Sequence, residues 1–235
     1  MLRSAMLTQA RKMANDNDST NPFHSDAALE AILDNWSIDM AMFLAWPRTT
    51  QSISFAIGDG GATGKNLNTD ILTILKVNWE PASGSNYSIL KPLTESELNM
   101  QYPEWRSWGN GTPAHYVLMD SVTEQAAAFP LRKITTERPT DTAMTMRIYY
   151  VQAPAASTTL TNCVVFPAPF HAVGVYYMAW QMYLPRNKQR ADEYMALYYA
   201  ERRRIRDQVM RWTQDNDVIA WDQYDGNTGV GNLTV

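Results

Sequence analysis

Apolar residues near the start of the chain recur with helical spacing and predict two helices. The first is short and ends in the polar run 15–22, and its apolar stripe consists of Leu2, Met6, Ala10 and Met13. The second begins near Ser25, a suitable N-cap residue followed by the favourably placed Asp26, and is stopped by Pro47. Its stripe comprises Leu29, Ile32, Leu33, Trp36, Met40, Phe43 and Leu44.

The middle of the chain, residues 51–166, changes to a period of two. Ile53, Phe55 and Ile57 alternate with small side chains, which is the pattern of a half-buried strand. Turn-rich stretches separate further expected strands at 70–79, 114–119, 126–131 and 144–151. The segment is therefore long enough to form a β-rich domain of its own.

Helical spacing returns after residue 166. Residues 171–184 are apolar nearly all round, so this helix is expected at the centre of a bundle or between subunits. A long final helix is predicted over 187–212, and its stripe consists of Tyr194, Leu197, Tyr198, Ile205, Val209 and Trp212. The tail 215–235 carries the large anchors Trp221 and Tyr224, so it is expected either to dock on a partner or to fold back on its own subunit.

These segments predict an α+β fold in which a helical bundle is interrupted by a β-rich insertion. Residues 1–50 and 167–214 are assigned to a bundle of about four helices, and residues 51–166 to the insertion. Residues 215–235 are assigned to an extended C-terminal arm.

Composition narrows the function classes. The chain is 45% hydrophobic with eight tryptophans but only 19% charged, which favours buried contacts with other protein chains. Its net charge of -4 and pI near 5.4 disfavour tight binding of nucleic acid. The single cysteine, Cys163, cannot form an internal disulfide, and the sequence suggests neither a signal peptide nor a membrane span. We therefore expect a soluble protein in a reducing compartment such as the cytoplasm.

No group of residues predicts a catalytic, cofactor or metal site. The run Gly58 to Lys65 resembles a phosphate-binding loop, but Asp59 and Asn66 stand where glycine and a hydroxyl residue are needed, so a flexible loop is expected. The cysteine has apolar neighbours typical of an inert thiol. The remaining candidates, whose spacing forms no motif, are His24, His115, His171 and the carboxylate pairs Glu95 with Glu97 and Asp192 with Glu193.

The strongest charged feature lies near the end of the last predicted helix. It contains Arg202, Arg203, Arg206 and Arg211. These arginines either cover a solvated helix face or contact acidic residues of a neighbouring subunit or passing nucleic acid. We favour the solvated face, and contacts between subunits are the functional hypothesis that stands beside it.

The order of these features resembles the head-to-tail adaptors of tailed bacteriophages, also called connector or neck proteins. In that family a helical bundle also carries an inserted β-region. One matching series runs from the strand at 71–79 through a short acidic turn within 90–98 to Pro103 and Trp105. The resemblance covers about residues 24–212, and its other parts are 111–116, 146–154 and the helix pair 171–212.

The resemblance implies a non-enzymatic virion protein in the neck, with no cofactor and no membrane contact. Such subunits form a ring of twelve copies between the portal and the tail or nozzle proteins, through which DNA passes without specific binding. They are made in the host cytoplasm before assembly. The alternatives are another virion component, such as a tail-completion or capsid-associated protein, an enzyme or small-molecule binding protein with a site in the β-rich region, and a nucleic-acid module using residues 202–211.

Overall fold

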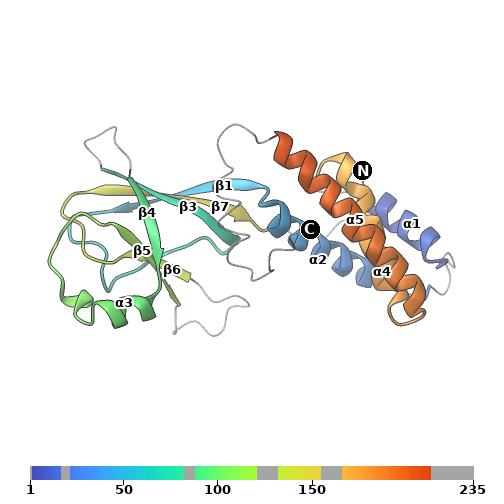
Figure 1. The fold of residues 1–235 in the computed structure, drawn as a ribbon, viewed down its shortest axis with the longest axis horizontal. Coiled ribbons are helices and arrows are strands. Elements are labelled where there is room, and N and C mark those ends of the chain that lie inside the picture. Colours follow the sequence, from blue (N-terminus) through green and yellow to red (C-terminus); the bar gives the residue numbers. More distant parts are fainter. Residues whose placement is uncertain (1, 17–21, 82–87, 121–131, 155–165, 213–235) are drawn as a thin grey trace, which may run out of the picture. The chain divides into compact units, whose positions relative to one another are not determined.

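The chain folds into two compact units. The computed structural model describes residues 2–16, 22–81, 88–120, 132–154 and 166–212. One unit comprises Met1–Trp46 with Pro154–Val235, and the other comprises Pro47–Ala153. The described part of the first unit is helical, whereas the second is built mainly from strands (Figure 1). The fold is therefore α+β, as the sequence predicts.

Four long helices form the first unit: α1 (Arg3–Met13), α2 (Asp26–Leu44), α4 (His171–Tyr183) and α5 (Lys188–Trp212). A single 3-10 turn, η2 (Ala168–Phe170), precedes α4. Helix α4 contacts each of the other three helices. The helix is apolar nearly all round, and its central position lets it bury side chains on several faces. The buried side chains include Val173, Val175, Met178 and Met182.

The ends of α2 follow from local chemistry. The Ser25 hydroxyl accepts a hydrogen bond from the Ala28 amide at 3.2 Å, which is the N-cap contact that the sequence predicts. At the other end Ala45 adopts a left-handed conformation with φ 47°, and its amide reaches back to the carbonyls of the last turn. The helix thus ends at Leu44, three residues before Pro47.

A tryptophan from α2 organises the core of the helical unit. Trp36 is fully buried and meets Phe166 edge-on, with ring centroids 5.4 Å apart. The indole also lies against Gly174 of α4, where a Cβ atom would come within 3.1 Å of the ring. Glycine at this position therefore lets the backbone of α4 approach the aromatic ring closely.

The second unit contains a seven-stranded mixed sheet with the order β1-β7-β3-β4-β5-β6-β2. All neighbouring pairs are antiparallel except β4 and β5, which are parallel. The strands are β1 (Arg48–Phe55), β2 (Lys65–Asn66), β3 (Ile71–Pro81), β4 (Ser88–Leu93), β5 (His115–Asp120), β6 (Arg132–Thr136) and β7 (Met144–Gln152).

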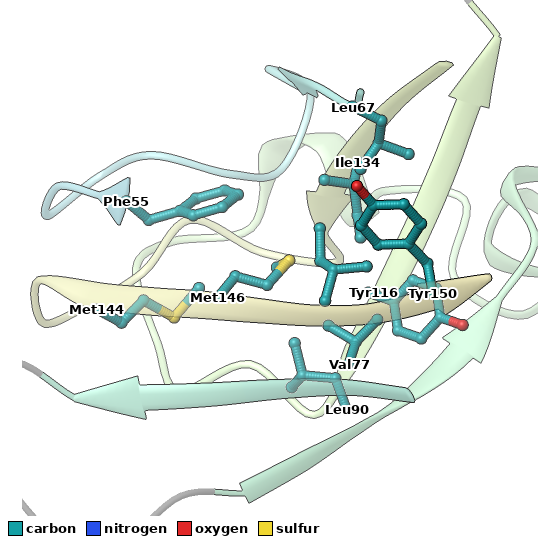
Figure 2. Packing of buried hydrophobic residues seen from close by; sticks show 10 residues of the cluster. Phe55, Leu67, Val77, Leu90, Tyr116, Ile134, Met144, Met146 and Tyr150 are labelled. Atoms are coloured by element: carbon teal, nitrogen blue, oxygen red, sulfur yellow. The ribbon is translucent and has the colours of Figure 1, made fainter. Parts of the chain in front are cut away.

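The core of this unit lies on one face of the curved sheet (Figure 2). Every second residue of β7 from Met144 to Tyr150 is buried, which is the alternation expected of a strand with one covered face. Ile53 of β1 pairs with Met146, so the alternating pattern at 51–55 is also confirmed. The cluster comprises Phe55, Leu67, Val77, Leu90, Tyr116, Ile134, Met144, Met146, Ile148 and Tyr150.

A glutamine links the two edges of the sheet. The Gln51 side chain of β1 donates to the Asn66 carbonyl of β2 at 3.4 Å and accepts from the Asn68 amide at 3.0 Å. No backbone hydrogen bonds pair β1 with β2 in the described sheet, but the side-chain amide of Gln51 bridges the two edge strands. The sheet is therefore nearly closed, which shields backbone groups that an open edge would expose.

Three strand and turn predictions need correction or lie outside the described part. The acidic turn expected within 90–98 is instead the end of β4 followed by the helix α3 (Glu95–Gln101), because Thr94 and Glu97 form a capping box. Ile57 was assigned to a strand, but β1 ends at Phe55 and Ile57 is 64% exposed, because the chain turns at Gly58 with φ 86°. The strand expected at 126–131 lies outside the described residues.

Candidate assembly surfaces

The arginine run on α5 divides into residues with different roles. Arg202 makes a two-pronged contact with the Asp39 carboxylate of α2, with both distances 3.2 Å, and its guanidinium lies 3.9 Å from the centroid of Phe43. Its side chain is only 16% exposed. Planar guanidinium groups suit such paired and stacked contacts, so Arg202 joins α5 to α2 within one chain.

A tyrosine strengthens the same junction. The Tyr198 hydroxyl of α5 donates a hydrogen bond to Asp39. Burial of the phenol, with the adjacent carboxylate as the second cause, raises the pKa of Tyr198 above its usual value. The hydroxyl thus remains a donor at any physiological pH, and Asp39 accepts from two α5 side chains.

The other predicted arginines are less constrained. Arg206 is half-buried, with its guanidinium 5.8 Å from the Phe43 ring centroid. Arg203 is exposed and makes no ion pair with the described part of the chain. Arg211 belongs to α5, but its side chain is not among those described, and Trp221 and Tyr224 lie outside the described residues. Contacts between subunits through these residues stay a prediction.

The composition suggests that tryptophans contact other protein chains, but the exposed apolar side chains are of other types. Each tryptophan whose side chain is described is buried or half-buried. The large apolar side chains that face solvent are mostly aliphatic or tyrosine. On the helical unit they are Leu2, Met13, Phe23, Ile38, Met42, Leu184, Leu197 and Tyr199, and on the β-rich unit Ile57, Ile89, Met100, Tyr102 and Leu118.

The glycine-rich segment from Gly58 to Lys65 is tied to the sheet rather than flexible. Asp59 accepts from the Ala56 amide at 2.8 Å and pairs with Lys65 at 2.8 Å, and these contacts, Lys65 first, lower the pKa of Asp59. The Gly61 amide donates to the Thr136 carbonyl, and the Thr135 hydroxyl donates to the Gly61 carbonyl. Lys65 therefore stabilises a turn through its ion pair with Asp59. It is followed by strand β3 and not by the helix that a phosphate-binding loop requires.

Substitution of Gly60 tests this tight turn. Gly60 has φ 110°, and an added Cβ would lie 2.2 Å from the Thr136 hydroxyl and 2.9 Å from the Arg138 carbonyl. We expect Gly60→Ala to lower the free energy of unfolding by at least about 2 kcal/mol. Gly58→Ala is the matched control, because φ is also positive there but no atom lies within 4 Å. Equal losses in urea unfolding of the two variants would contradict the crowding argument.

Each of the three histidines has its own structural partner. His171 Nε2 lies 2.7 Å from the Phe166 carbonyl, and His24 Nε2 lies 3.1 Å from the Met182 carbonyl. His115 Nδ1 is 3.8 Å from Glu137, whose carboxylate accepts the Ala114 and His115 amides. Within the described ranges no three histidine, cysteine or acidic residues gather as a metal site would require. Cys163 lies outside those ranges.

The buried histidine makes the helical unit sensitive to acid. Burial lowers the pKa of His171 below its usual value of 6.5. As the pH falls below 6.5, the unfolded chain therefore binds a proton that the folded chain does not, and stability decreases by up to about 1.4 kcal/mol per pH unit. Melting temperatures of the wild type and His171→Gln between pH 8 and 5 should show a steeper loss for the wild type. Parallel curves would rule out this role.

Three of the four acids in the carboxylate pairs that the sequence left open have local partners. Glu95 pairs with Arg106, and Glu97 accepts the Thr94 amide as part of the α3 capping box. Glu193 pairs with Arg190 one turn earlier on α5. Glu95 and Glu97 lie on α3 and Glu193 on α5, each beside its own partner, whereas Asp192 is exposed on α5.

Comparison with known proteins supports the reading of this chain as an assembly component. No helix in the described ranges is long and apolar enough to cross a membrane. No curated protein matches the chain. The family model for the SU10 adaptor protein matches residues 1–220, which is nearly the whole sequence and includes both units. The chain therefore belongs to the SU10 adaptor protein family, a family of phage head-tail adaptors that are structural proteins rather than enzymes.

Proposed function

We propose that this protein is one subunit of a ring in the neck of the virion, between the portal and the tail or nozzle proteins. The family match over residues 1–220 carries this proposal. The helical unit supports it, because α1, α2 and α5 each expose apolar side chains that an isolated subunit leaves in water. A ring of twelve copies is the arrangement that the adaptor resemblance implies, with assembly in the host cytoplasm.

The proposal includes a central channel through which DNA passes without sequence-specific binding. The net charge of -4 would repel duplex DNA from channel walls that shared it, and this repulsion would lower friction. Two arginines of the α5 run are also paired with carboxylates, Arg202 with Asp39 and Arg204 with Glu201. Such pairing leaves less positive charge available for phosphates than the sequence suggests. Purified protein should therefore bind duplex DNA weakly or not at all at physiological salt.

The decisive experiment mixes the purified full-length chain with portal protein from the same phage. Mass photometry and negative-stain microscopy should show rings of the protein attached to the portal. A lone chain that remains monomeric is compatible with the proposal only when portal binding is observed. Failure to associate with portal and with tail or nozzle proteins would overturn it.

Another virion component remains the second candidate, since tail-completion and capsid-associated proteins would share the exposed apolar side chains. Immunogold labelling of intact particles distinguishes the two. A signal at the neck supports the adaptor role, and a signal on the capsid shell or along the tail supports the alternative.

A further inference from the structure

The outward face of α2 carries no charge. Ala31, Asn35, Ile38 and Met42 are all exposed, and their spacing places them on one side of the helix. Ile38 is 37% exposed and Met42 is 40% exposed. We call these four residues the α2 face. A helix with apolar residues on both its inner and outer sides is normally covered on both.

Acidic residues border the α2 face along one edge. Asp34 and Glu30 lie one turn apart on that edge. Asp34 is paired with the buried Arg3 at 2.7 Å. The Glu30 carboxylate makes no ion pair with the described residues, although its backbone carbonyl accepts from Arg3. The edge of the face thus offers one free carboxylate to a partner.

The outward face of α5 has the complementary pattern. Ala196, Ala200 and Arg203 are exposed and spaced to lie along one line of the helix, with Leu197 and Tyr199 on its two sides. We call these five residues the α5 face. Leu197 is 48% exposed and Tyr199 is 43% exposed. Small alanines between larger side chains suit the ridges-into-grooves packing of another helix, and Arg203 adds a cation that no described residue pairs.

Both faces point outward because the inner sides of the two helices are already joined. Asp39 of α2 binds Tyr198 and Arg202 of α5 within the chain. The α2 face and the α5 face lie on other sides of their helices, so this junction leaves both exposed. The helices and their positions in the helical unit can be followed in Figure 1.

We propose that the α2 face of one copy packs against the α5 face of the next copy. The charges favour a second copy as the partner. The uncharged α2 face is edged by the Glu30 carboxylate and the apolar α5 face carries Arg203, and no described residue pairs with either charge. Two different faces of one chain form a heterologous contact, and such contacts generate closed rings when the rotation between copies closes. This inference rests on the proposed ring function and identifies the surfaces that would build the ring.

Helix geometry is consistent with an antiparallel contact. From Glu30 to Ile38 the axis of α2 advances about 12 Å, and from Arg203 back to Ala196 the axis of α5 advances about 10 Å. If Arg203 of one copy meets Glu30 of another, Ile38 therefore lies beside Ala196 and Leu197. The ion pair fixes the register and direction, and the apolar contact excludes water.

Charge reversal tests the contact in the full-length chain. With portal protein present, Glu30→Arg and Arg203→Glu should each raise the dissociation constant for ring assembly at least about tenfold. The double variant should recover most of the lost affinity, because every contact between copies regains one pair of opposite charges. Lys12→Glu is the control, since Lys12 is exposed on α1 and makes no ion pair with the described residues. Circular dichroism melts confirm that each variant folds.

A cross-link gives an independent readout. Copies carrying Glu30→Cys are mixed with copies carrying Arg203→Cys, both with Cys163→Ser, and oxidised after assembly on the portal. A disulfide between the two kinds of copy supports the contact. The interface would be overturned if the wild type forms rings, the charge-reversal variants assemble as well as the wild type, and no cross-link appears. That result would leave the adaptor function intact. A wild-type protein that never associates with itself, portal or tail would overturn both.

Discussion

Replacing Trp36 by alanine is expected to lower the free energy of unfolding of the helical unit by about 3–5 kcal/mol, the range for deleting a large buried aromatic side chain. Trp36 is fully buried between α2 and α4, against Phe166 and Gly174. The surrounding helices cannot close over the space, because the backbone of α4 already lies against the ring at Gly174. Urea unfolding followed by far-ultraviolet circular dichroism measures the loss.

Trp36→Phe separates the volume of the ring from its polar group. The indole Nε1 is buried and has no hydrogen-bond partner among the described residues, so its removal should cost nothing by itself. We therefore expect Trp36→Phe to be clearly milder than Trp36→Ala. Losses of equal size in the two variants would show that the packing described for α2 and α4 is wrong.

Replacing Trp105 by alanine should produce a loss of similar size, about 3–5 kcal/mol, in the β-rich unit. Trp105 follows α3 in the 3-10 turn η1 (Trp105–Ser107), and it is fully buried against Leu98 and Val117. Its Nε1 donates to Asn99 Oδ1 at 2.8 Å, so the variant also removes a hydrogen bond. Hydrogen exchange should report faster exchange in α3 and β5.

Trp108→Ala is the matched control for Trp105→Ala. Trp108 is half-buried and lies beneath the Arg138 guanidinium, 4.8 Å from the ring centroid. Removing it opens less buried volume, so the expected loss is smaller. An effect of Trp108→Ala equal to that of Trp105→Ala would contradict the assignment of Trp105 as the main anchor of α3.

Together the two tryptophan variants test the proposed domain organisation. If residues 1–50 with 167–214 and residues 51–166 fold as separate units, Trp36→Ala should accelerate exchange in α2 and α4 and leave β7 protected. Trp105→Ala should have the reverse pattern. Acceleration throughout the described chain in both variants would show that the units unfold as one.

Part of what the structure added was readable in the sequence. Thr94 followed by Glu97 is a capping-box signature, and it would have predicted α3 in place of an acidic turn. Ile38 and Met42 lie outside the apolar stripe of α2, which is the signal that this helix is apolar on a second side. The role of Arg202 had no such signal, because Asp39 and Phe43 are far from it in sequence.

The sequence alone determined the type and order of the main elements. Helical spacing identified α1, α2, α4 and α5, and alternation identified β1, because each period reflects a side-chain geometry that is local to the chain. Turn-rich boundaries identified β3, β5 and β7. Only the tertiary structure decided the order of the strands and the linking of the sheet edges by Gln51. It also decided which arginines form ion pairs within the chain. These features depend on contacts between residues distant in sequence, and local periodicity carries no information about such contacts.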